Sequence, residues 1–183
     1  ITEAAMRGEL DFEAALKERV ALLAGLSTDA LQQCYDERIE LMAGARALVQ
    51  TMKANGAYAV LVSGGFTFFT EKVAAAIGFD MNRANILGIE GNALTGLVEE
   101  PICGAATKLE ALNEQAAKHG LTAAEILAVG DGANDIPMIE AAGLGVAYHA
   151  KPKTREAAAA AVTYGDLTTL LYFQGYADAV FVS

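Results

Sequence analysis

The chain of 183 residues is poor in cysteine, proline and basic side chains, and it contains no tryptophan. Its two cysteines, Cys34 and Cys103, lack metal-ligand spacing, so we expect reduced thiols in a cytoplasmic protein and no disulfide framework. The chain has only 13 lysines and arginines but 23 acidic residues, and the resulting net charge of −10 argues against a nucleic-acid-binding face. Any phosphate that the chain binds must therefore be small and held locally.

Long apolar runs are also missing, although hydrophobic residues make up 54% of the chain. Charges or glycines interrupt each run before it could span a bilayer, so no membrane segment is expected. Residues 1–9 have neither the basic nor the apolar region of a signal peptide, and they lack an initiator Met, so we expect the chain to begin inside a longer protein. The length allows one core with a small second subdomain, in a monomer or a homodimer.

Helical periodicity dominates the N-terminal part. Apolar residues recur on one face over residues 10–24, and a second helix is expected from Ser27 or Thr28 to about Leu41. No strand pattern occurs there, so we predict that residues 1–41 form a separate helical lobe, which the family resemblance described below implies is a cap, and that residues 42–183 form an α/β core.

Strand and helix patterns alternate after residue 42. We predict helices over 44–55, 66–77, 104–119, 154–161 and 166–176, and strands over 57–62, 126–129, 144–147 and around 162. Strands over 84–90 and 93–99 flank Gly91-Asn92 and predict a β-hairpin. The alternation favours a doubly wound, Rossmann-type parallel sheet with helices on its faces.

Chemistry is expected where the strand at 126–129 ends. Asp131 and Asp135 lie four residues apart in a glycine-rich turn, with Asn134 between them. Two carboxylates beside small residues suit a hard cation such as Mg²⁺, which keeps waters that a phosphate can replace. The alternative is an ordinary turn in which Asn134 or Asp135 caps the helix that Pro137 enters.

Two further candidates fit a phosphate site. Ser63-Gly64 follows the first predicted strand, and Lys108 belongs to the helix over 104–119. Phosphoryl transfer needs hydroxyl and backbone donors, a cation and a metal, and these residues supply them at strand ends. Ser63 could instead cap a helix, and Lys108 could belong to a solvated face beside Glu110 and Glu114.

Together these motifs resemble a known superfamily. Ser63-Gly64-Gly65-Phe66, the Lys108 helix and Gly130–Asp135 are similar to three of the four signature motifs of the haloacid dehalogenase (HAD) superfamily. The residues in these motifs are similar to those of the phosphoserine phosphatase family within this superfamily, which acts in serine biosynthesis. Gly165-Asp166-Leu167 also resembles that family. The resemblance implies a HAD-like α/β core with a small helical cap.

The resemblance also implies roles for single residues. Asp131 would bind Mg²⁺, Asp135 would hold Lys108 or the surroundings of the metal, and Lys108 would neutralise the phosphoryl group. Substrate-binding residues would be Met6, Phe12, Arg19, Ser63, Gly64, Lys108 and Asn134. Arg19 would bind the substrate carboxylate, while Met6 and Phe12 would close the pocket against water. The alternative for Arg19 is a helix-surface ion pair with Glu18.

One family motif has no counterpart in the chain. The Asp-x-Asp-x-Thr run that supplies the nucleophile is absent, and Asp11 lies inside a predicted amphipathic helix with no strand before it. We therefore expect the chain to start within the cap, because an N-terminal segment is missing, because the protein was truncated or because the gene start was placed too late. In the family, the strand that carries this motif is central in the sheet. Its loss is expected to leave unpaired backbone groups on the two neighbouring strands, and the 183 residues alone are expected to form no aspartyl-phosphate.

The resemblance predicts Mg²⁺-dependent hydrolysis of O-phospho-L-serine through an aspartyl-phosphate. A phosphatase or phosphotransferase for another small phosphorylated metabolite is one alternative. A catalytically inactive homologue that binds such a metabolite is another.

Overall fold

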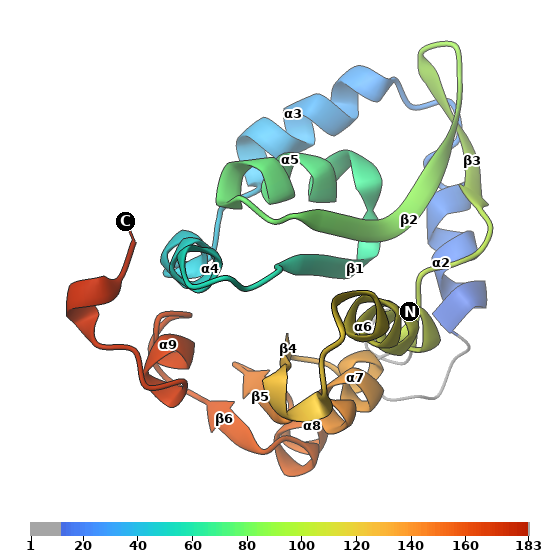
Figure 1. Cartoon of the computed structure of the whole chain (residues 1–183). Helices are drawn as coiled ribbons and strands as arrows, with labels where there is room; N and C mark the ends of the chain where they lie inside the picture. The colour runs from blue at the N-terminus through green and yellow to red at the C-terminus, as the bar shows by residue number, and fades with distance from the viewer. Residues whose placement is uncertain (1–11, 183) are drawn as a thin grey trace. The chain divides into compact units, whose positions relative to one another are not determined.

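The computed structural model describes residues 12–182 and has an α/β architecture (Figure 1). The chain divides into two compact units. One comprises the residues up to Ala15 together with Cys103–Tyr164, and the other comprises Leu16–Ile102 with Gly165–Ser183. The predicted domain boundary between residues 41 and 42 falls inside the second unit. The division into a helical cap and a core stays a prediction. None of the helices within residues 12–182 combines the length and apolar character needed to cross a membrane.

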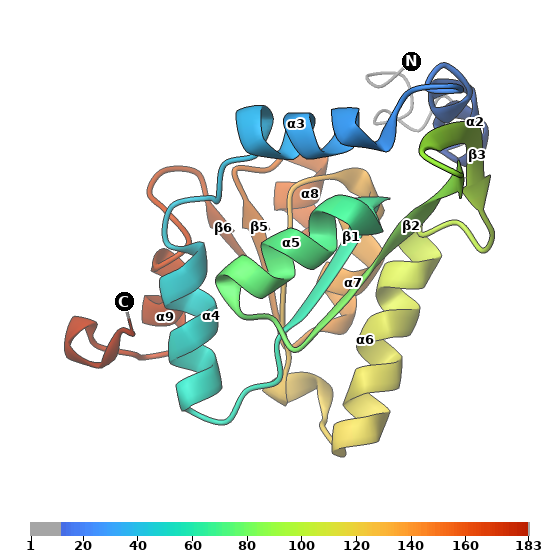
Figure 2. The ribbon, with the colours of Figure 1, turned by 90° about the horizontal axis from the view of Figure 1, so that it is seen from above.

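The second unit is built on a three-stranded sheet in the order β1-β2-β3. Its strands are β1 (Val60–Phe66), β2 (Met81–Glu90) and β3 (Ala93–Glu99). The first half of β2 pairs parallel to β1, and its second half pairs antiparallel to β3. Figure 2 shows β2 continuing out of the parallel pair into the hairpin with β3. Gly91, with φ of 60°, forms the predicted hairpin turn.

The second unit also contains several helices. They are α2 (Phe12–Ala21), which starts in the first unit, α3 (Thr28–Arg38), α4 (Ala45–Ala54), α5 (Thr67–Ile77), α9 (Thr169–Phe173) and the 3₁₀ turn η3 (Asp178–Val180). The crossover helix α5 packs on both β1 and β2 (Figure 2). Ala45 and Val49 of α4 meet Ile77 of α5 in a buried apolar cluster. The predicted helices over 44–55 and 66–77 are thus confirmed to within a residue or two at each end.

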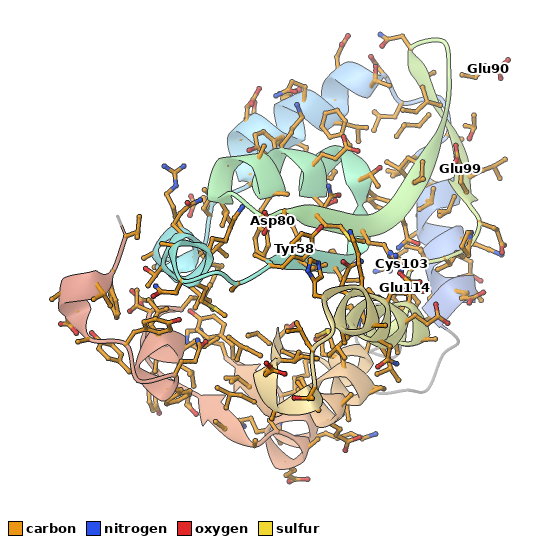
Figure 3. All side chains as sticks on the ribbon, viewed as in Figure 1. Tyr58, Asp80, Glu90, Glu99, Cys103 and Glu114 are labelled. Atoms are coloured by element: carbon orange, nitrogen blue, oxygen red, sulfur yellow. The ribbon has the colours of Figure 1, made fainter. Side chains whose placement is uncertain are left out.

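Asp80 fastens α4 to the turn between α5 and β2. Its Oδ1 lies 2.7 Å from Lys53 Nζ, and its Oδ2 accepts a hydrogen bond from Ala59 N at 2.8 Å. Lys53 also donates to Gly78 O at 2.7 Å. Figure 3 labels Asp80 beside the segment that leads into β1. Because a single carboxylate binds both neighbours, this ion pair fixes the point at which β1 enters the sheet.

The first unit contains a parallel sheet in the order β4-β5-β6. Its elements are α6 (Ala105–His119), η1 (Ala123–Glu125), β4 (Leu127–Gly130), η2 (Ala133–Asp135), α7 (Ile136–Ala141), β5 (Leu144–Tyr148), α8 (Pro152–Ala157) and β6 (Ala160–Val162). Val146 and Ala147, in the middle of β5, are completely buried. Helix α7 packs on β4 and β5, and α6 packs on α7.

The 3₁₀ turn η1 precedes β4 and is held by Thr122 and Glu125. Thr122 N and Oγ1 both donate to Glu125 Oε2, at 2.9 and 2.8 Å. These hydrogen bonds, the backbone one most of all, hold the pKa of the exposed Glu125 carboxyl below its usual value. The capping pair therefore orders the chain between α6 and β4.

The parallel pairing confirms the predicted α/β class, while several boundaries were wrong. The alanine run was expected in a helix to residue 161, but α8 ends at Ala157 and Ala160–Val162 forms β6. Small alanines fit beside β5, so sheet packing overrides their helix propensity. The first strand continues to Phe66, and the last helix, expected over 166–176, spans only Thr169–Phe173.

The sheet is divided differently from the prediction. The predicted single sheet is divided into two three-stranded sheets, and β1 and β4 each lie at the edge of their own sheet. Cys34 is exposed and Cys103 is buried, and neither forms a disulfide in the described part of the chain.

A buried hydroxyl in α8 offers a test of the packing. Thr154 is fully buried, and its Oγ1 has no hydrogen-bond partner in the described part of the chain. Thr154→Val keeps the side-chain shape and removes an unsatisfied polar atom, so we expect the free energy of unfolding to rise by about 1 kcal/mol in urea denaturation.

Thr51 provides the matched control for this substitution. It is equally buried, but its Oγ1 accepts a hydrogen bond from Val182 N at 2.8 Å. Thr51→Val should therefore lower the free energy of unfolding. If Thr154→Val destabilises the protein as much as Thr51→Val does, the Thr154 hydroxyl has a partner after all.

Candidate functional site

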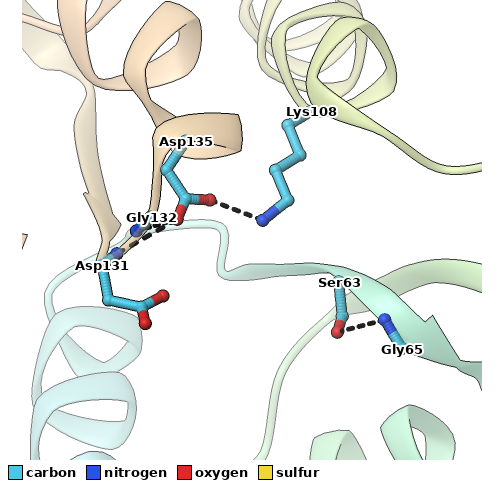
Figure 4. Close-up of polar contacts among 6 residues, drawn as sticks. All are labelled: Ser63, Gly65, Lys108, Asp131, Gly132 and Asp135. Atoms are coloured by element: carbon cyan, nitrogen blue, oxygen red, sulfur yellow. Dashed lines mark hydrogen bonds and ion pairs between the residues drawn. The ribbon is translucent and has the colours of Figure 1, made fainter. Parts of the chain in front are cut away.

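The turn after β4 is organised by the Asp135 carboxylate. Asp135 Oδ2 accepts hydrogen bonds from the backbone N of Asp131 and of Gly132, each at 3.0 Å. Asp135 Oδ1 lies 2.5 Å from Lys108 Nζ (Figure 4). Both carboxylate oxygens are thus occupied within the protein, so Asp135 holds the turn and Lys108 together.

Lys108 reaches this carboxylate from α6. The side chains of Lys108 and Asp135 are only 9% and 4% exposed. The alternative that Lys108 belongs to a solvated face is therefore wrong. Removing either partner would leave an uncompensated buried charge, which costs about 3–5 kcal/mol in comparable cases.

Glycines allow the side chains of Asn134 and Asp135 to lie close to the backbone of the turn. A Cβ at Gly130 would collide with the Asp135 side chain, and one at Gly132 would lie 2.9 Å from Asn134 Oδ1. The Asn134 side chain thus folds back over Gly132. These contacts explain why glycine stands on both sides of Asp131.

Asp131 differs from Asp135 in what its carboxylate contacts. Its backbone O accepts a hydrogen bond from Lys151 N at 3.1 Å, which ties the turn to the segment after β5. The side chain is exposed, and within residues 12–182 its carboxylate has no hydrogen bond or ion pair. A fixed backbone with an available carboxylate at a strand end can bind a cation.

The described residues offer a metal few further ligands. In that part of the chain, no three His, Cys, Asp or Glu side chains gather as a metal-binding group. Mg²⁺ is commonly bound by one or two carboxylates, with waters and phosphate oxygens completing its shell. The single available carboxylate of Asp131 fits that mode, whereas Asp135 is already used by other groups.

The capping alternative is partly right for Asp135. Asp135 occupies the N-cap position of α7, but its side chain makes no capping hydrogen bond to that helix. It bonds backward to the turn instead. The residue therefore stabilises the entry to η2, and it does so while holding Lys108.

Ser63 lies inside β1 and not after it. The Ser63 Oγ accepts a hydrogen bond from Gly65 N at 3.0 Å (Figure 4), which forms a turn within the strand. The N-cap of α5 is Phe66, so the interpretation of Ser63 as a helix cap is wrong. On the other side of the same turn, Gly64 O accepts a hydrogen bond from Asn85 Nδ2 at 2.9 Å.

The predicted cap residues lie on or before α2. Phe12 is half-buried, and its ring lies 3.6 Å from the position of a Cβ on Gly104, the N-cap of α6. It therefore packs over the start of the helix that carries Lys108. Arg19 is half-buried in α2. Met6 lies outside the described residues.

The candidate residues divide between the two units. Phe12, Lys108, Asp131, Asn134 and Asp135 belong to the first unit, and Arg19, Ser63 and Gly64 belong to the second. Within the first unit, the structure brings Lys108, Asp135 and the Asp131 backbone into contact. Sequence reasoning missed Asn85, because only the pairing of β1 with β2 shows that it reaches Gly64.

Known proteins resemble the chain in sequence and in fold. Residues 1–140 match the family model of haloacid dehalogenase-like hydrolases. A phosphoserine phosphatase of Albidiferax ferrireducens is 48% identical over 176 residues, which cover 93% of this chain and 74% of that protein.

Solved structures support the same grouping. An unliganded probable phosphoserine phosphatase from Vibrio cholerae matches with a TM-score of 0.88 and 39% identity, over 98% of this chain and 55% of that one. A substrate-bound phosphoserine phosphatase matches with a TM-score of 0.88 and 36% identity, over 94% of this chain and 81% of that one. The chain thus spans about half the length of the first structure. The resemblance found in the motifs is confirmed: the chain belongs to the haloacid dehalogenase-like hydrolases, in the phosphoserine phosphatase family.

Proposed function

We propose that the protein containing this chain hydrolyses O-phospho-L-serine to L-serine and phosphate, as a step of serine biosynthesis. The observation that carries the proposal is the turn after β4, where a buried Lys108–Asp135 pair fixes a backbone whose Asp131 carboxylate remains available. The phosphoserine phosphatases among the relatives support the substrate. The two free thiols support a reducing compartment such as the cytoplasm.

Mg²⁺ is the proposed cofactor, and Asp131 is the residue that would bind it. When bound, the ion supplies positive charge that orients and neutralises a phosphoryl group. The available oxygen ligand supports Mg²⁺ over a softer metal, because Mg²⁺ prefers oxygen donors and needs few protein ligands. Asp135 acts beside it by holding the backbone of Asp131 and Gly132 in place.

The phosphoryl group is proposed to be held by the chain's own donors. Lys108 provides a cation with its position fixed by Asp135. Ser63 Oγ and the backbone N–H of Gly64 donate hydrogen bonds to phosphate oxygens, and the Asn134 amide faces the same group. Donors that are already in place when charge develops in the transition state need no reorganisation.

Selection of a carboxylate-bearing substrate is assigned to the cap, over residues 1–41. Arg19 binds the carboxylate of phosphoserine, because a guanidinium matches it with two parallel hydrogen bonds. Met6 and Phe12 exclude water from the substrate. The position of Phe12 against the start of α6 supports this role.

The nucleophile is not assigned to any residue of this chain. The sequence has no Asp-x-Asp-x-Thr run. We therefore propose that the aspartyl-phosphate forms on a carboxylate outside these 183 residues.

The first test is an assay of phosphate release from phosphoserine. The full-length natural protein should turn the substrate over, lose activity in EDTA and regain it with Mg²⁺, whereas the 183 residues alone should be inactive. Turnover by the 183 residues alone would contradict the assignment of the nucleophile. A full-length protein that binds phosphoserine without releasing phosphate would favour the inactive homologue.

Asp131→Asn in the full-length protein tests the metal site. Loss of one anionic ligand weakens Mg²⁺ binding, so kcat should fall by about two orders of magnitude or more. Asp36→Asn, at an exposed position of α3, is the matched control and should leave kcat unchanged. An Asp131→Asn variant within threefold of wild type would remove Asp131 from the metal site.

Arg19→Ala tests the recognition of the carboxylate. The KM for phosphoserine should rise about tenfold or more, and the KM for phosphoethanolamine, which lacks that carboxylate, should change little. Arg38→Ala, at the exposed end of α3, controls for the loss of a surface cation. Equal effects on both substrates would return Arg19 to the alternative of a structural ion pair.

A further inference from the structure

We propose that Asn85 is a positioning residue that sets the orientation of the Ser63–Gly65 turn for phosphate binding. The inference rests on the proposed function, in which Ser63 and Gly64 hold phosphate oxygens. It begins from an irregularity in the pairing of β1 with β2. Val62 pairs with Arg83 and Phe66 pairs with Asn85, so β1 advances by four residues while β2 advances by two.

This bulge takes Ser63, Gly64 and Gly65 out of the regular ladder. Backbone groups released from a ladder need other partners when they are buried. Asn85 lies where regular pairing resumes, is only 1% exposed, and donates from Nδ2 to Gly64 O at 2.9 Å. Its side chain therefore gives the carbonyl at the centre of the turn a hydrogen-bond partner.

The hydrogen bond from Asn85 orients the whole Gly64–Gly65 peptide group, and so also the Gly65 N–H. Gly64 C=O and Gly65 N–H belong to the same planar trans peptide, in which the two bonds point in opposite directions. Holding the carbonyl on the Asn85 side directs the N–H to the other side. There Gly65 N donates to Ser63 Oγ at 3.0 Å. Asn85 is thus linked to the Ser63 hydroxyl through a single rigid peptide.

This link determines how Ser63 can bind a ligand. A serine hydroxyl has one donor hydrogen and two acceptor lone pairs. Because Gly65 N–H uses an acceptor position, the O–H of Ser63 is directed to a different acceptor, such as a phosphate oxygen. Gly65 permits the close approach, since a Cβ there would lie 3.2 Å from Ser63 Oγ.

Asn85 suits this role because it offers a neutral donor. A carboxylate of the same shape would place a negative oxygen against Gly64 O, and an apolar side chain would take away the hydrogen-bond partner of that part-buried carbonyl. Substitution therefore turns the peptide away and misplaces the Ser63 hydroxyl. Small misplacements of binding groups cost up to about 100-fold in rate.

The experiment compares Asn85→Leu and Asn85→Asp with Asn55→Leu and Asn55→Asp in the full-length protein. Asn55 is the control for losing an asparagine hydrogen bond to a backbone carbonyl. Its Nδ2 donates to Thr51 O at 2.8 Å, but it lies at an exposed position at the end of α4. Three quantities are measured: kcat/KM for phosphoserine, the inhibition constant for inorganic phosphate, and the hydrogen-exchange rate of the Gly65 amide.

We expect both Asn85 variants to lower kcat/KM about 10- to 100-fold, to weaken phosphate inhibition by about tenfold, and to speed Gly65 exchange. The Asn55 variants should change only the thermal midpoint. The defect of Asn85→Asp should shrink as pH falls, because the protonated carboxyl can again donate to Gly64 O, whereas that of Asn85→Leu should not.

Kinetic constants for Asn85→Asp within threefold of wild type, or an unchanged Gly65 exchange rate, would overturn the inference. So would a loss of activity that only follows the loss of thermal stability seen with Asn55. A wild-type protein that releases no phosphate would instead refute the proposed function, and with it this role, and that result is visible before any variant is made.

Discussion

The first unit depends on an ion pair that is removed from water. Taking an ammonium and a carboxylate out of solvent is costly, and their attraction offsets that cost only when the remaining hydrogen-bonding positions are also filled. Asp135 meets this condition by accepting from Lys108 and from two backbone N–H groups. Three segments, α6, the end of β4 and η2, thereby converge on one side chain.

In the second unit, the Ser63–Gly65 turn is held by a donor side chain instead of an acceptor. Asp135 is an acceptor that gathers N–H groups, whereas Asn85 is a donor that holds a C=O and so directs the N–H of the same peptide the other way. In both cases a buried polar side chain fixes a glycine-rich turn near a strand end. Glycine supplies the room, and the polar side chain chooses one conformation among those that glycine allows.

Local pattern was sufficient to predict the long elements of the fold. Gly56, Gly78 and Gly120 mark the ends of α4, α5 and α6 to within two residues, because a left-handed residue ends a helix whatever packs around it. The prediction of a helix through the alanine run was wrong, because alanines adopt a strand where their small side chains fit beside β5. Propensity decides such a segment only when tertiary packing does not.

The site residues show the same division. Lys108, Asp131 and Asp135 could be predicted from motif wording, since their spacing along the chain carries the signal. The position of Ser63 within β1 and the contact of Asn85 with Gly64 could not, because both follow from a register shift between two strands. Register is a property of paired segments, and a single strand's pattern does not contain it.

Charge explains how such an acidic chain can hold a phosphate ester. A phosphate monoester carries nearly two negative charges at neutral pH, and this chain has a net charge of −10. At the turn after β4, Asp135 compensates Lys108, and Asp131 adds a further negative charge. These groups by themselves would repel the ester, whereas a divalent cation on Asp131 would reverse the sign of the local charge. In the proposed site, Ser63 and Gly64 would add hydrogen bonds without adding charge. The proposed division of labour follows: the metal would supply the attraction, and hydrogen-bond donors held in fixed positions would supply the selectivity for a phosphoryl group.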